Sequence, residues 1–377
     1  MGETHLATIT LRAKGLSITT PEYKDVYFNY YWLRDNCPTS FHPEIQERTF
    51  DICQLQQAPC AQQAEVIDDK LVINWANEDH TSEFDFAWLL AWQAQPGRED
   101  AAALPRKHWF GDYYPKLFRA TQADLENTLE NRLNWIQAML EHGIAIITGM
   151  RDNDQSITDL ANLIGHVRPS VEGYYFDVKA KAKAEAYSLS FTAAALEMHT
   201  DTPAEENAPG IQFLHCRAND TTGGDNLFLD GAAVAEDFRK SNPKGFDILS
   251  GVSVPFYYDH TNFDWRSRQR VIETDHQGNV TGLTVSQHMA DLFDLPQQQL
   301  DDYYPAFVEF MQLLRNERYL MRFRLNAGEC VVFDNHRIIH GRDAYAANSG
   351  SRHLRGCYTD RGELRSRYRT LYKQLVS

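Results

Sequence analysis

The sequence predicts a mainly β protein, a sandwich or barrel of short strands with a few helices packed outside it. Two observations predict this fold class. From Gly210 onward most segments have the length and pattern of strands, with turn signals such as TTGGDN and DHQGN between them. Residues 6–90 also contain short strand-like segments, as in VYFNYYWLR and KLVINW. Many strands and few helices are typical of sandwiches and barrels.

The length of the chain, 377 residues, predicts a main domain and a smaller one. We expect a small β-rich N-terminal domain at residues 1–95. Residues 96–120 are rich in Pro, Gly, Arg and Lys and suit a linker. The main domain then spans residues 121–377.

Three segments predict helices. The first, TQADLENTLENRLNWIQAMLEHG, opens at Thr121 or Asp124 and closes at Gly143. The second is SITDLANLIGHV, with Ser156 as its cap. The third begins at Pro305 and ends near Asn316. The buried strand IAIITG directly follows the first helix.

The composition excludes several classes of protein. The formal net charge of -15 would repel a phosphate backbone, so nucleic acid is not an expected partner. No CxxC pair occurs among the six cysteines, which favours a reducing cytoplasm over a disulfide scaffold. The start lacks the apolar run of a signal peptide, and no stretch of 18 apolar residues occurs, so no membrane partner is expected.

A metal-ligand pattern lies in the second half of the chain. His199 and Asp201 are two residues apart, so in an extended strand both side chains point to one face. A second histidine, His340, follows in FDNHRIIHGR. Two imidazoles and one carboxylate form the facial triad of iron(II) oxygenases, which leaves positions open for a bidentate 2-oxo acid and O₂. An HxD pair alone is a weak signal, because most such pairs are solvated turns or buried, hydrogen-bonded groups.

The residues around this pattern make it more specific. Arg352 follows His340 by twelve residues and could clamp the far carboxylate of 2-oxoglutarate through two parallel hydrogen bonds. Asn226 ends the TTGGDN turn and is placed to hydrogen-bond the 2-oxoglutarate carboxylates. We therefore expect Fe(II), 2-oxoglutarate and O₂ to meet at one site.

Two segments, HTDTPAEENAPGIQFLHCRANDTTGGDNLFLDG and VVFDNHRIIHGRDAYAANSGSRHLRGCYTD, closely resemble the γ-butyrobetaine and trimethyllysine hydroxylases. This group belongs to the taurine-dioxygenase-like Fe(II)/2-oxoglutarate-dependent oxygenases. The resemblance extends to the N-terminal segment YWLRDNCP and so covers nearly the whole chain. It implies a double-stranded β-helix (jelly-roll) catalytic domain and a small N-terminal domain. It also implies iron at His199, Asp201 and His340, and 2-oxoglutarate at Arg352, with Asn226 as a weaker match.

The same resemblance indicates where a substrate would bind. The γ-butyrobetaine enzymes surround a trimethylammonium group with aromatic rings from the segment before the HxD motif, because a desolvated quaternary cation is attracted to π faces. Phe176 and Phe191 stand where the family has Trp and Tyr, and Thr202 stands where the animal enzyme has Tyr. The expected substrate-pocket residues are Tyr174, Tyr175, Phe176, Ser188, Phe191, Thr202 and Ser286.

In this family the N-terminal domain often holds zinc through three cysteines and a histidine. Here Thr39 stands in place of the middle cysteine and His42 in place of the last, whereas His80 matches the histidine, so three possible ligands remain: Cys37, His42 and His80. Structural zinc normally takes four ligands. Two interpretations stay open, a zinc site at these three residues and a metal-free turn held by hydrogen bonds.

The leading hypothesis is a dioxygenase that hydroxylates a C–H bond of a small polar, betaine- or amino-acid-like metabolite. One alternative uses the same cofactor site for desaturation, cyclisation or another biosynthetic oxidation. A second alternative is a non-catalytic ligand-binding jelly-roll protein, but such a protein has no need for all four of His199, Asp201, His340 and Arg352. The resemblance alone suggests a homodimer.

Overall fold

The computed structural model describes residues 7–94, 97–179, 190 and 192–376. The chain divides into two compact units, Met1–Glu99 and Asp100–Ser377. The residues of the candidate iron site lie in the second unit, which also contains the larger sheets.

The first unit contains two three-stranded antiparallel sheets. Their strands are β1 (Thr8–Arg12), β2 (Gly15–Thr19), β3 (Val26–Asn29), β4 (Ala61–Ile67), β5 (Lys70–Trp75) and β6 (Thr81–Asp85). Two helices, α1 (Tyr30–Asp35) and α2 (Phe86–Ala94), and the short 3-10 turns η1 (Pro38–Ser40) and η2 (Ile52–Gln54) complete it. Its core includes Leu16, Phe28, Leu71 and Phe84. The predicted β-rich character of the N-terminal region is confirmed.

The second unit is built on two sheets that face each other across a shared core. The larger sheet has the order β7 (Phe118–Thr121), β8 (Ile144–Thr148), β18 (Cys330–Asp334), β11 (Ile211–Asn219), β20 (Arg352–Thr359) and β9 (Phe176–Val178). The smaller has the order β10 (Leu196–His199), β19 (Ile338–Arg342), β12 (Asn226–Asp230) and β17 (Met321–Phe323). The predicted mainly β fold, a jelly roll with flanking helices, is confirmed.

Strand β8, inside the larger sheet, is apolar on both faces. Ile144 and Ile146 point into the core shared with the smaller sheet, where they join Phe228 and Phe333. Ala145 and Ile147 join a second apolar cluster with residues of the helices outside. A strand covered on both sides needs apolar residues at every position, which explains the continuous run IAII.

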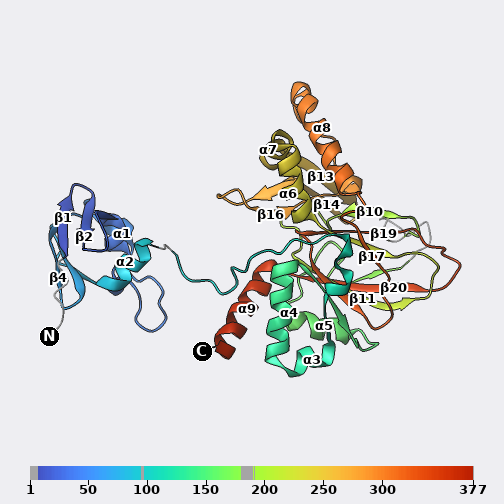
Figure 1. The fold of residues 1–377 in the computed structure, drawn as a ribbon, viewed down its shortest axis with the longest axis horizontal. Helices are drawn as coiled ribbons and strands as arrows, with labels where there is room; N and C mark the ends of the chain where they lie inside the picture. Colours follow the sequence, from blue (N-terminus) through green and yellow to red (C-terminus); the bar gives the residue numbers. More distant parts are fainter. Residues whose placement is uncertain (1–6, 95–96, 180–189, 191, 377) are drawn as a thin grey trace. The chain divides into compact units, whose positions relative to one another are not determined.

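Helices lie on two sides of the paired sheets (Figure 1). One group is α3 (Gln122–Asn127), α4 (Leu129–His142), α5 (Gln155–Asn162) and α9 (Arg361–Val376). The other is α6 (Gly231–Ser241), α7 (Pro243–Gly251) and α8 (Gln297–Leu313). The second group packs with β13 (Ser253–His260), β14 (Phe263–Arg270), β15 (Ile272–Thr274) and β16 (Val280–Leu283). The short turns η3 (Gly111–Lys116) and η5 (Gln287–Met289) lie between larger elements.

The helix boundaries differ from the sequence prediction in three places. The first predicted helix is two helices, because Thr128 has extended backbone between α3 and α4. Ser156 lies inside α5, where its hydroxyl accepts a hydrogen bond from the Arg151 N–H, and is not the cap. The third helix begins at Gln297, so Pro305 lies in its interior. Thr121 caps the start of α3, and Gly143 caps the end of α4, as predicted.

Most of the expected linker 96–120 is part of the second unit. The Arg106 guanidinium donates hydrogen bonds to the carbonyls of Val280 and Thr281. The Trp109 side chain is buried in the core between the two sheets. The strand that begins at Phe118 pairs in parallel with β8. The sequence predicted an irregular linker here because the polar residues of this segment form no periodic pattern. In the structure they contact scattered main-chain groups of the second unit.

Candidate iron and cosubstrate site

Strand pairing brings the two histidines together. β10 pairs antiparallel with β19, and His199 stands directly opposite His340 in that register. The sheet continues with β12, where Phe228 stands opposite His340. Asp201 follows two residues after the end of β10. The end of β10 thus brings His199 and Asp201 next to His340 of the neighbouring strand β19.

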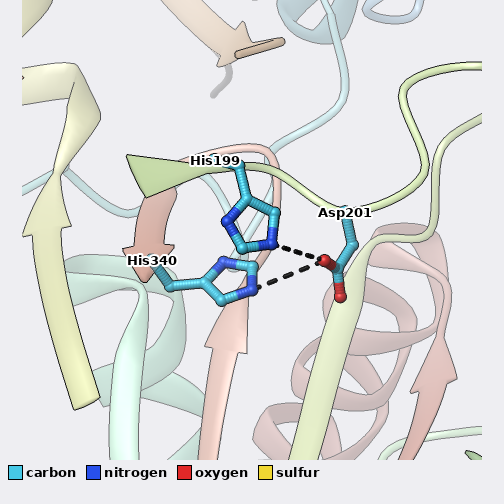
Figure 2. Close-up of side chains that lie close together, drawn as sticks. All are labelled: His199, Asp201 and His340. Atoms are coloured by element: carbon cyan, nitrogen blue, oxygen red, sulfur yellow. Dashed lines mark hydrogen bonds and ion pairs between the residues drawn. The ribbon is translucent and has the colours of Figure 1, made fainter. Parts of the chain in front are cut away.

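The three side chains converge on one point (Figure 2). The Nε2 atom of His199 lies 3.1 Å from Oδ1 of Asp201, and Nε2 of His340 lies 3.5 Å from the same oxygen. Within the described part of the chain, these are the only three His, Cys, Asp or Glu residues grouped closely enough to hold a metal ion. Two imidazole nitrogens and one carboxylate oxygen match the donor set of non-haem iron(II).

Neighbouring groups hold these side chains in place. The His199 Nδ1–H donates to the carbonyl of Glu197 at 2.8 Å, which directs Nε2 toward Asp201. Asn335 holds the main chain of Asp201, since its Oδ1 accepts from the Asp201 N–H at 2.7 Å and its Nδ2 donates to the Asp201 carbonyl at 3.2 Å. The Tyr358 hydroxyl donates to Oδ2 of Asp201 at 2.7 Å.

The electrostatics of the site favour its metal-binding protonation states. Burial alone would raise the pKa of Asp201, but the His340 and His199 imidazoles hold that pKa well below its ordinary value. Burial, and then the adjacent His199, lowers the pKa of His340. An ionised carboxylate beside a neutral imidazole is what a divalent cation requires.

A buried cationic region lies in the same cavity as the three residues. The Arg352 side chain is buried, and its terminal nitrogen donates to Oδ1 of Asn226 at 3.3 Å. Neither Nε of Arg352 nor Nδ2 of Asn226 has a hydrogen-bond partner among the described residues, although both are buried. Burial, and then the charge of Arg342, lowers the pKa of Arg352 to about 10. A buried guanidinium with unused donors fits a carboxylate ligand.

The turn before Asn226 also shapes this region. Gly224 has a φ of +81°, and a Cβ added there would lie 3.3 Å from Nε of Arg352. Glycine therefore supplies both the left-handed backbone and the space beside the guanidinium. The predicted tight turn TTGGDN is confirmed, and it delivers Asn226 to the cavity.

The structure sorts the predicted substrate residues into three groups. Phe176 and Thr202 line the cavity, and Thr202 has an unusual positive φ of 48° directly after Asp201. Tyr174, Tyr175 and Ser286 do not line it. Ser188 and Phe191 lie outside the described residues.

Each of the three residues that do not line the cavity has a local reason for its position. Tyr174 is 58% exposed. The Tyr175 ring faces away from the cavity, where its hydroxyl accepts from Thr158 of α5 at 2.8 Å. Ser286 is buried behind His288, with 3.3 Å between its Oγ and Nδ1 of that histidine. Tyr175 directly precedes β9, and successive side chains of an extended chain point to opposite sides, which explains the contrast with Phe176.

Several cavity residues were missed by the sequence prediction, among them Tyr358, Arg342, His288, Tyr258, Glu172 and Gln212. His288 was expected to be an ordinary core or surface histidine, but its ring lies 5.1 Å from that of His199. Tyr358 shares a strand face with Arg352, six residues earlier, and Arg342 shares one with His340. The period of two in a β-strand was the signal that could have found both.

The three expected zinc ligands do not form one cluster. Sγ of Cys37 lies 3.5 Å from Nε2 of His80, and the Thr39 hydroxyl lies 3.1 Å from the same sulfur. His42 turns to its own loop, where Nδ1 accepts from the N–H groups of Glu44 and Ile45. A three-ligand zinc site at Cys37, His42 and His80 is therefore not formed in the described residues. The Thr39 hydroxyl lies beside the Cys37 and His80 pair, and the two interpretations, a zinc site and a hydrogen-bonded turn, both stay predictions.

None of the helices in the described ranges has the length and apolar character needed to cross a membrane.

Comparison with known proteins gives consistent matches. The model of the family described as taurine catabolism dioxygenase TauD, TfdA family matches residues 110–358. A gamma-butyrobetaine dioxygenase from Pseudomonas sp. (strain AK-1) is 35% identical over 375 residues, covering 98% of this chain and 96% of the relative. The gamma-butyrobetaine dioxygenase of Homo sapiens is 31% identical, covering 91% of each chain.

A more distant relative is the mitochondrial trimethyllysine dioxygenase of Bos taurus, which is 25% identical over 91% of this chain and 82% of its own. Among solved structures, AAD-2 in complex with Mn(II) and N-oxalylglycine matches with a TM-score of 0.52 and 16% identity, covering 64% of this chain and 94% of the other. That likeness concerns the fold.

Proposed function

This chain belongs to the taurine catabolism dioxygenase TauD, TfdA family, and on that premise we propose that it hydroxylates a C–H bond of a small betaine-like or amino-acid-like metabolite. It is a 2-oxoglutarate-dependent dioxygenase that uses Fe(II). The observation that carries the proposal is a single cavity lined by His199, Asp201, His340 and the buried Arg352.

We assign the iron to His199, Asp201 and His340. When bound, Fe(II) and 2-oxoglutarate would together activate O₂ for the oxidation of an unactivated C–H bond. The task of the chain is to hold the three ligand atoms in position, and the Glu197 carbonyl and Asn335 do this from outside the ligand set. Partners of this kind commonly tune metal affinity as strongly as some ligands do.

We assign the far carboxylate of 2-oxoglutarate to Arg352, with Asn226 beside it. The neighbouring Arg342 is a poorer candidate, because its guanidinium already donates to the carbonyls of Thr192 and Ala194 at 2.8 and 2.6 Å. The buried donors without partners on Arg352 and Asn226 leave a carboxylate as the group that would satisfy them.

The aromatic part of the cavity suits a cationic substrate. The Phe176 ring stacks on Tyr358 with centroids 5.1 Å apart, and Tyr258 and Glu172 also line the cavity. Aromatic faces and a carboxylate attract a desolvated cation. The named relatives act on γ-butyrobetaine and on trimethyllysine, which both carry a quaternary ammonium group. We therefore place a betaine-like substrate first.

A substrate screen tests this proposal. The full chain is incubated with Fe(II), 2-oxoglutarate and O₂, and succinate release is measured with γ-butyrobetaine, trimethyllysine, other quaternary amines and free amino acids. We expect a quaternary amine to stimulate succinate release and to gain one oxygen atom in mass. A product that has lost two hydrogens would indicate desaturation instead. No stimulated release with any of these compounds would overturn the proposal.

A further inference from the structure

A second cavity of the same unit is lined by an unusual number of arginines. It lies among α4, α9, the segment around residues 100–106 and the turn between β18 and β19, and it shares no lining residue with the iron cavity. Figure 1 shows α4 and α9 side by side at this part of the fold. Its arginines are Arg106, Arg337, Arg361, Arg365 and Arg369, and we call it the arginine cavity.

Three of these arginines are neutralised by carboxylates. Arg369 forms two hydrogen bonds with Asp100, at 2.6 and 2.7 Å. Nε of Arg361 lies 3.1 Å from Asp334. The fully buried Arg337 pairs with Asp230 at 2.8 Å. Five guanidinium groups thus face three carboxylates, in a chain whose formal net charge is -15.

The two remaining arginines have no carboxylate partner in the described residues. Arg106 is held in place by the main-chain carbonyls of Val280 and Thr281. Arg365 forms no hydrogen bond or ion pair with any residue that the structure describes. Burial, and then the charge of Arg361, lowers the pKa of both Arg106 and Arg365. The excess positive charge is therefore partly desolvated and repels itself.

We propose that the arginine cavity binds a small oxyanion with two negative charges, of the kind represented by inorganic phosphate and by dicarboxylates. Guanidinium groups present planar pairs of donors that match such oxygens. The cavity volume of about 330 Å³ is far above the roughly 10–15 Å³ that a single water needs. The proposal does not depend on the substrate proposed above.

A bound oxyanion would join elements that support the iron site. Asp334, at the end of β18, and Arg337, in the turn between β18 and β19, line the arginine cavity. Asn335, which lies between them in sequence, holds the main chain of Asp201. Arg365 comes from α9. The anion would therefore tie α9 to the turn that positions one expected iron ligand.

Calorimetric titration with inorganic phosphate tests the proposal. The full chain is first loaded with Mn(II) and N-oxalylglycine, so that Arg352 is occupied, and ionic strength is held constant with chloride. We expect one saturable phosphate site. Arg365→Gln should weaken it by about tenfold or more, because it removes a charge-assisted contact. Since Arg365 has no partner to lose, this variant should fold normally.

Arg270→Gln is the matched control. Arg270 is exposed on β14, and its substitution changes the net charge by the same amount as Arg365→Gln. It should bind phosphate as the parent does. Phosphate should also raise the thermal midpoint of the parent and of Arg270→Gln, and should raise that of Arg365→Gln by less at the same phosphate concentration. A parallel titration with succinate identifies the source of the anion: tighter binding of succinate would assign a dicarboxylate, and tighter binding of phosphate a phosphate group. No saturable binding of either anion, or equal binding by Arg365→Gln and the parent, would overturn the proposal.

Discussion

The environment of Arg352 supports the binding of a 2-oxoglutarate carboxylate more directly than that of any other residue discussed above. Its side chain is buried, and its Nε lacks a partner within the described residues. Arg352→Gln should raise the KM for 2-oxoglutarate far more than the KM for the primary substrate, since losing one member of such a pair costs about 2–5 kcal/mol. Succinate release at varied 2-oxoglutarate measures this, with Arg270→Gln as the control. Equal proportional changes in both KM values would remove Arg352 from the cosubstrate site.

Tyr358 connects the aromatic part of the cavity to the expected iron ligand. Its ring stacks on Phe176, and its hydroxyl donates to Oδ2 of Asp201. Tyr358→Phe keeps the ring and removes only the hydrogen bond. We expect metal affinity to fall by about tenfold, with a smaller change in the KM for a quaternary amine. Titration with Mn(II) measures the affinity, and an unchanged value would show that the hydroxyl does not position Asp201.

At the scale of elements, the turn between β18 and β19 supports the iron site through one side chain. Asn335 accepts from the N–H of Asp201 and donates to the carbonyls of Asp201 and Pro209. Asn335→Ala should reduce metal affinity or activity by about 10-fold to 100-fold. Asn279→Ala, in the exposed turn before β16, is a control that removes an asparagine far from these contacts. If both variants bind Mn(II) like the parent, the turn does not position Asp201.

Local sequence patterns predicted many elements, because the order of apolar and polar residues in an element reflects which of its faces are buried. The run IAII predicted the buried strand β8, and Gly143 marked the end of α4 with its positive φ of 79°. The interior position of Pro305 could not be read locally, since α8 is stabilised there by apolar packing of Tyr303, Ala306 and Phe310. Tertiary packing of this kind overrides local propensity.

The site itself depends on pairings that sequence spacing does not contain. The register that sets His199 opposite His340 joins strands from distant parts of the chain. The family resemblance supplied that partnership, whereas the HxD spacing supplied only the first two residues. His288 was missed because a histidine after a strand carries no periodic signal, and its place beside His199 is set by the packing of η5.

For the whole molecule, buried histidines predict a loss of stability in acid. Burial, and then the charge of Arg217, lowers the pKa of His215 to about 4. Between the ordinary histidine pKa of about 6.5 and this value, the unfolded chain binds a proton that the folded chain does not, so stability falls as pH falls through this window. The full shift corresponds to about 3 kcal/mol.

Urea unfolding at pH values from 7 to 4 tests this prediction. His215→Gln cannot titrate and should lose less unfolding free energy over that range than the parent. His276→Gln, at an exposed position, should follow the parent. Parallel curves for the parent and His215→Gln would show that His215 does not contribute to the acid sensitivity.

The central claim is that His199, Asp201 and His340 hold one ferrous ion while 2-oxoglutarate chelates it. Anaerobic titration of the full chain with Fe(II) and 2-oxoglutarate, followed by visible absorption, tests this most directly. We predict a weak charge-transfer band that appears with the parent and is absent from His199→Ala and Asp201→Ala. A parent protein without the band, or variants that keep it, would contradict the assignment of the iron to these three residues.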